Sequence, residues 1–94
     1  MAISDIKPEL DVLDKMIDHV QRKIRSNENI MGAINSTYEY ETFFGTQTNQ
    51  AEIDAMKLNV QALGVLLTYR SDLMNYAVGI GSQPTLNLPS GFKF

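Results

Sequence analysis

Few side chains in this 94-residue chain could take part in catalysis. The single histidine, His19, directly follows Asp18, but adjacent residues of a helix point apart and do not form an acid–base pair. Arg70 and Asp72 are the only charged residues between positions 58 and 92. Neither a nucleophile nor a second base accompanies them, as covalent or acid–base catalysis would require. We therefore expect a protein without enzyme activity.

The residues that usually hold metals and phosphates are also scarce. The chain has no cysteine, and one histidine does not suffice for a zinc site of nitrogen and sulfur ligands. Gly79 and Gly81 lack the third glycine and the following helix of a phosphate-binding loop. We expect neither a metal nor a cofactor.

Charge and hydropathy exclude two further classes of partner. A net charge of −3 and a pI near 4.9 argue against binding to nucleic acid, which needs a basic surface. The aromatic residues that could stack on bases are interleaved with Glu39 and Glu41, so we expect them to pack at a helix end. They are Tyr38, Tyr40, Phe43 and Phe44. The longest apolar run has about eight residues, far fewer than the ~20 of a membrane span.

The first long segment has a heptad pattern of apolar residues. Its seam positions advance by alternating steps of four and three, the period of a left-handed coiled coil. The positions are 6, 10, 13, 17, 20, 24, 27, 31, 34 and 38. Pro8 suits the first turn of a helix, where its missing N–H has no intrahelical partner. We predict one helix from about Pro8 to Phe43.

Asn27 is the polar member of this seam. A polar seam residue often fixes the register or the number of subunits at some loss of stability, so Asn27→Leu is expected to stabilise the chain. The alternative is that the helix frays or breaks at residues 26–29, which are rich in side chains that favour caps and turns. The unbroken heptad phase favours a continuous helix.

Residues 44–48 predict a turn, because Gly45 can adopt the left-handed conformation that ends helices. A second helix should then run from about 50 to 78, starting with a capping box between Asn49 and Glu52. Such a short connection makes the two helices antiparallel neighbours. The predicted fold is all-α, with a long coiled-coil-like helical hairpin over residues 1–80.

The second helix carries two apolar rows at helical spacing. One consists of Ile53, Met56, Val60, Leu63, Leu67, Met74 and Ala77. The other consists of Ala62, Leu66, Tyr69, Leu73, Tyr76 and Ile80. A helix with one packing partner needs a single apolar stripe, so two rows predict contacts on two sides. We expect an oligomer whose interface contains Leu66, Tyr69, Leu73, Tyr76 and Ile80. Arg70 interrupts the first row and should face the partner helix or a subunit interface, where its guanidinium can reach a carboxylate.

Residues 81–94 differ in character from the helices. Their glycines and prolines exclude a helix, yet large apolar residues occupy even positions, which would face one way in an extended chain. We predict an extended C-terminal arm that docks on a neighbouring subunit, with a frayed terminus as the alternative. Its expected anchors are Leu86, Leu88, Phe92 and Phe94.

A helical hairpin with a wide apolar surface and an extended arm resembles small subunits of polymeric assemblies. Examples are cement, neck and tail proteins of bacteriophage virions, and needle or rod subunits of secretion systems and flagella. The resemblance implies a structural virion protein that is made in the host cytoplasm. Its partners would be copies of itself and a larger structural protein. The alternative is a small cytoplasmic adaptor or assembly chaperone.

Overall fold

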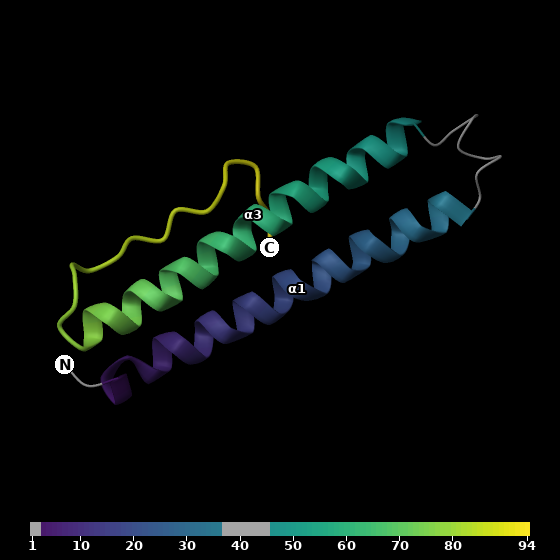
Figure 1. Cartoon of the computed structure of the whole chain (residues 1–94). Helices are drawn as coiled ribbons and strands as arrows, with labels where there is room; N and C mark the ends of the chain where they lie inside the picture. The colour runs from purple at the N-terminus through teal and green to yellow at the C-terminus, as the bar shows by residue number, and fades with distance from the viewer. Residues whose placement is uncertain (1–2, 37–45) are drawn as a thin grey trace.

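The computed structural model describes residues 3–36 and 46–94, with side chains described for 3–29 and 50–94. A 3-10 helix, η1 (Ile3–Ile6), leads into α1 (Lys7–Ser36), and α3 spans Thr46–Ala77. The two long helices lie side by side and run antiparallel (Figure 1). Within the described ranges no strand occurs, so the prediction of an all-α fold with two packed helices is confirmed.

α1 begins where the sequence predicted and is continuous through residues 26–29. The predicted helical residues 37–43 and the aromatic cluster from Tyr38 to Phe44 lie outside the described residues. α3 begins at Thr46, before the predicted start near Gln50. Asn49 is therefore already inside the helix and does not cap it.

The C-terminal end of α3 is closed by glycine in a left-handed conformation. Gly79 has a φ of +85°, and its N–H donates to the carbonyl of Tyr76. The N–H of Ile80 donates to the carbonyl of Asn75 at 2.8 Å. These two bonds form a Schellman motif, which satisfies carbonyls that the helix itself leaves free. The motif also turns the chain back toward the helices.

The hydrophobic core lies along the line where the helices meet. From η1 and α1 it takes the predicted seam residues, and from α3 it takes residues at three- and four-residue spacing. Its buried members are Ile6, Leu10, Leu13, Ile17, Val20, Ala62, Leu66, Leu73 and Ala77. Full burial of one large aliphatic side chain contributes about 1.5–3 kcal/mol, so this seam is the main source of stability.

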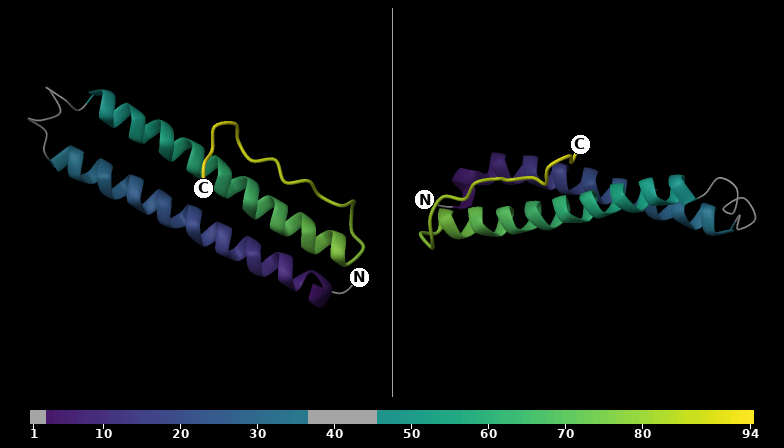
Figure 2. Two further views of the ribbon diagram at one scale, coloured as in Figure 1. Left: turned by 180° about the vertical axis from the view of Figure 1, so that it is seen from behind. Right: turned by 90° about the horizontal axis from the view of Figure 1, so that it is seen from above.

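Residues 78–94 have no helix or strand and run back along the helix pair (Figure 2). Leu86, Leu88 and Phe92 are partly buried against the core described above. Near its end the segment makes a tight turn in which the N–H of Phe92 donates to the carbonyl of Pro89 at 3.1 Å. Gly91, with a φ of +85°, occupies the turn position that requires a positive φ.

This arrangement changes the interpretation of the predicted arm anchors. Three of the four, Leu86, Leu88 and Phe92, pack against the chain's own core, and contact with a neighbouring subunit stays a prediction. The physical reason is that two helices alone leave one side of their seam open to water. The C-terminal segment is long enough to return and cover it. Phe94 remains 51% exposed.

Candidate interaction surfaces

A polar network is buried between the two helices at Asn27. Asn27 and Asn59 are only 8% and 5% exposed. The Nδ2 of Asn59 donates to Oδ1 of Asn27 at 2.7 Å, and the Nδ2 of Asn27 donates to Oε2 of Glu52 at 2.7 Å. The amide of Asn27 thus links two positions of α3, and it satisfies a buried polar group of the opposite helix.

The sequence placed Asn27 in the seam but missed both of its partners. Asn59 occupies the seam position before Ala62 and Leu66, so extending that row by one step would have found it. Glu52 was predicted to close a capping box, and instead it accepts a hydrogen bond from α1. A one-residue slip of either helix would separate Asn27 from Asn59, which makes the pair suited to fixing the register.

Arg70 joins the helices on the edge of the seam. Its Nε donates to Oδ1 of Asp14 at 2.8 Å, and its Nη1 lies 3.3 Å from the sulfur of Met74. The side chains of Arg70 and Asp14 are 34% and 55% exposed, so water and salt screen the ion pair. Arg70 therefore faces the partner helix and reaches one of its carboxylates, as one of the two alternatives predicted, and a place in a subunit interface stays a prediction.

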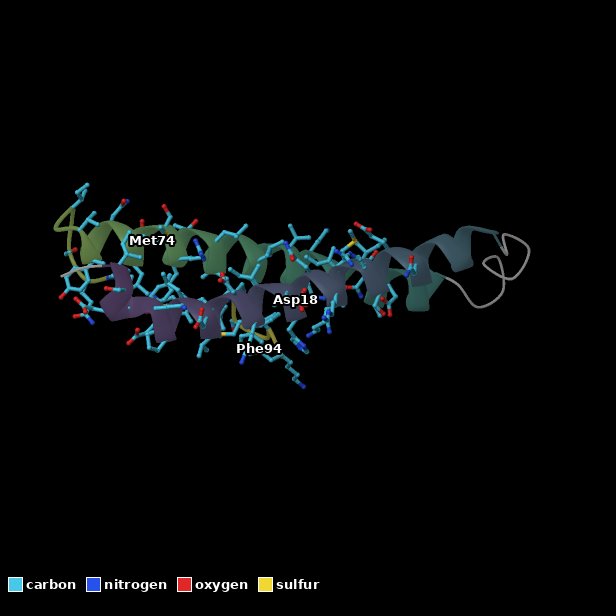
Figure 3. All side chains as sticks on the ribbon, turned by 90° about the horizontal axis from the view of Figure 1, so that it is seen from below. Asp18, Met74 and Phe94 are labelled. Carbon is cyan, nitrogen blue, oxygen red and sulfur yellow. The ribbon has the colours of Figure 1, made fainter. Side chains whose placement is uncertain are left out.

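The end of the C-terminal segment is held against α1. Phe92 and Phe94 pack edge to face, with ring centroids 4.9 Å apart, and Nζ of Lys23 lies 5.0 Å from the centroid of Phe92. Lys23 also donates to the carbonyl of Lys93. Nε2 of His19 lies 3.1 Å from the carbonyl oxygen of Phe94, which Figure 3 shows beside α1 near Asp18. The predicted surface histidine thus helps to hold this segment.

The residues predicted for the subunit interface have two different environments. Leu66 and Leu73 are 0% and 7% exposed and belong to the intramolecular core, so their assignment to a subunit interface is corrected. Tyr69 and Tyr76 are partly buried against the same core, whereas Ile80 is 62% exposed. The row that contains these tyrosines faces α1 and the C-terminal segment, and periodicity alone could not tell which of the two rows would face inward.

The other apolar row of α3 is only partly exposed, because Ala77 is buried and Leu63 and Met74 pack against the core. We call the rest of this row the outer face of α3 and define it by Ile53, Met56, Val60 and Leu67. Val60 and Leu67 are 49% and 48% exposed, and a shallow depression lies beside Ile53, Met56 and Val60. The outer face therefore presents two half-exposed apolar side chains, Val60 and Leu67, to water, with the partly exposed Met56 and Ile53 one and two turns before Val60.

Within the part of the chain that the structure describes, no group of acidic or histidine side chains could hold a metal ion. None of the described helices is long and apolar enough to cross a membrane. In comparisons with family models, curated proteins and solved structures, nothing matches this chain. The functional argument therefore rests on the surfaces described above.

Proposed function

We propose that this protein is a non-enzymatic structural subunit that assembles with copies of itself through the outer face of α3. The observation that carries the proposal is the pair of half-exposed apolar side chains on this face, Val60 and Leu67, with the partly exposed Ile53 and Met56 beside them. A large contiguous apolar patch on a soluble protein commonly marks a protein-binding surface.

The charge distribution supports this choice of surface. From Leu58 to Gly91 the chain carries only Arg70 and Asp72 as charged residues, and Arg70 is already paired with Asp14. Charged residues are depleted at the centres of protein interfaces because their desolvation is costly. The middle of α3 thus has the composition of an interface centre.

The setting we propose is an ordered particle such as a virion, in which a larger structural protein is a further partner. The support is the resemblance of shape and composition: a slender helix pair, with principal-axis extents of 58 × 20 × 16 Å, that has a small core for its length. Such a subunit gains stability when neighbours cover its exposed apolar side chains.

A cytoplasmic adaptor or assembly chaperone is the second candidate. It is favoured by the packing of Leu86, Leu88 and Phe92 on the chain's own core. These side chains cover the open side of the helix seam, so a second copy is not needed to cover it. An adaptor of this kind would use the outer face of α3 for a different protein, and it would be monomeric alone.

The test compares the wild-type chain with Val60→Lys and Leu67→Lys by sedimentation velocity. We expect the wild type to associate and both variants to sediment as monomers with unchanged circular dichroism. Val12→Lys is the matched control, because Val12 is an exposed apolar residue of α1 that is 56% exposed. Association of both outer-face variants at the wild-type level would contradict the proposal.

A further inference from the structure

We propose that the groove between α3 and the C-terminal segment binds an extended peptide of a partner protein, and that this peptide carries a basic side chain. The proposal goes beyond self-association through the outer face of α3 and does not depend on it. It rests on the length of the groove, on a glycine in its helical wall, on an unpaired carboxylate at one end and on the extended chain that forms its other wall.

The groove has a volume of about 620 Å³ and lies where the C-terminal segment runs back beside α3 (Figure 1). Its helical wall is formed by residues at three- and four-residue spacing, namely Gln61, Gly64, Val65, Thr68 and Asp72. From the first to the last of these the helix advances by roughly 16 Å, at about 1.5 Å per residue. About five residues of extended chain cover that length. The groove therefore has the length of a short extended peptide.

Gly64 leaves the middle of the helical wall without a side chain. A Cβ added there would have no heavy atom within 4 Å, and Gly64 does not have a positive φ. Neither the backbone nor the packing of the single chain therefore requires glycine at this position, although glycine weakens a helix interior relative to alanine. In the wall of a groove, a glycine lets the backbone of a bound chain approach the helix closely.

Asp72 determines the charge of the proposed peptide. It is the only charged residue among those that line the groove. It is exposed, and among the described residues it has no ion-pair partner, since Arg70 pairs with Asp14. A lysine or arginine of a bound peptide would supply that partner. Along the rest of the groove, neutral side chains can donate to and accept from peptide groups. They are Gln61, Thr68, Thr85 and Asn87.

The C-terminal segment forms an extended wall opposite α3. Leu86 and Leu88 pack against the core, whereas Thr85 and Asn87 are exposed and line the groove. Within the described part of the chain, the peptide groups of residues 85–88 take part in no backbone hydrogen bond. Such unpaired groups can bond to a second extended chain, which is a common mode of peptide recognition. The segment thus favours an extended peptide as the occupant.

The first experiment selects peptides from a phage-displayed library of random heptapeptides on the immobilised full-length chain. Binding of the enriched peptide, synthesised with a fluorescent label, is then measured by anisotropy at low salt. We expect the enriched peptides to contain lysine or arginine and to change the amide NMR signals of the residues that line the groove. No enrichment, or signal changes confined to the outer face of α3, would overturn the proposal.

The second experiment measures binding of the same peptide to Gly64→Leu and Asp72→Asn. Ser71→Leu and Asp54→Asn are the matched controls, because both residues are exposed on α3 and lie outside the groove. We expect Gly64→Leu to weaken binding about tenfold, Asp72→Asn about fivefold and each control less than about twofold. Circular dichroism should show the same helicity in all of them.

Two results of the second experiment would contradict the proposal. Equal effects of the groove variants and their controls would place the peptide elsewhere on the chain. Displacement of the labelled peptide by free arginine amide at the same concentration as by unlabelled peptide would show a site for a small cation and not for a peptide. Sedimentation of the wild-type chain tests the proposed self-association separately, so either proposal can fail without the other.

Discussion

The buried asparagine pair predicts a strong coupling between two substitutions. Asn27→Leu leaves the buried Nδ2 of Asn59 without its acceptor, and Asn59→Leu leaves Oδ1 of Asn27 without its donor. A buried polar group without a partner costs about 1–3 kcal/mol. The added apolar surface of leucine offsets part of this cost in each single variant, so neither should stabilise the chain strongly.

The double variant Asn27→Leu/Asn59→Leu removes both unsatisfied amides and places two leucines in contact. It should therefore be more stable than the sum of the single effects predicts, with a coupling free energy of about 1–3 kcal/mol. Glu52 loses the amide of Asn27 in the double variant but is only partly buried, so water can replace that donor. The sequence alone predicts that Asn27→Leu stabilises the chain. The structure predicts no strong stabilisation, because the leucine would leave the buried amide of Asn59 without its acceptor.

The assay is urea unfolding of the four proteins, followed by circular dichroism at several protein concentrations. The concentration series is needed because association adds to the apparent stability. If the two single effects add to within about 0.5 kcal/mol, the amides do not interact and the description of the buried network is wrong.

Three further predictions concern other contacts. Phe92→Ala should lower the free energy of unfolding by about 1–2 kcal/mol, because Phe92 packs on the core and under Lys23, whereas Phe94→Ala should have less than half that effect. Gly79→Ala should destabilise by about 1 kcal/mol because its φ is +85°. Arg70→Met should cost less than about 1 kcal/mol, and high salt should reduce the difference, since the partner Asp14 is exposed.

Thermal unfolding measures all three, because 1 kcal/mol shifts the melting temperature of a chain this size by about 4–8 °C. Equal effects of Phe92→Ala and Phe94→Ala would show that the C-terminal segment does not pack as described. An unchanged melting temperature in Gly79→Ala would argue against the Schellman motif. If Arg70→Met lowers the melting temperature by the same amount at low and high salt, the arginine stabilises the chain through packing and not through the ion pair.

The sequence predicted the seam of α1 well because each heptad position obeys the same geometric constraint. Ile6, Leu10, Leu13, Ile17 and Val20 are all buried, and all were identified by spacing alone. The period of a helix depends only on local geometry, so it can be read without knowledge of the partner.

The assignment of faces on α3 could not be predicted in the same way. Both of its rows are apolar, and the choice between them depends on which one α1 and the C-terminal segment cover. Leu66 and Leu73 therefore belong to the core, while Val60 and Leu67 face water. Leu86 and Leu88 pack on helices that are distant from them in the sequence, and the spacing of apolar residues does not predict such tertiary contacts.

The most direct test of the central claim is the mass of the unmodified full-length chain in solution. Sedimentation equilibrium should be measured from low to high micromolar concentration, with circular dichroism on the same samples. Self-association through the outer face of α3 predicts a mass that rises from the 10.5 kDa of one chain to a multiple of it. A fully helical species that stays at 10.5 kDa across the whole range would contradict the claim.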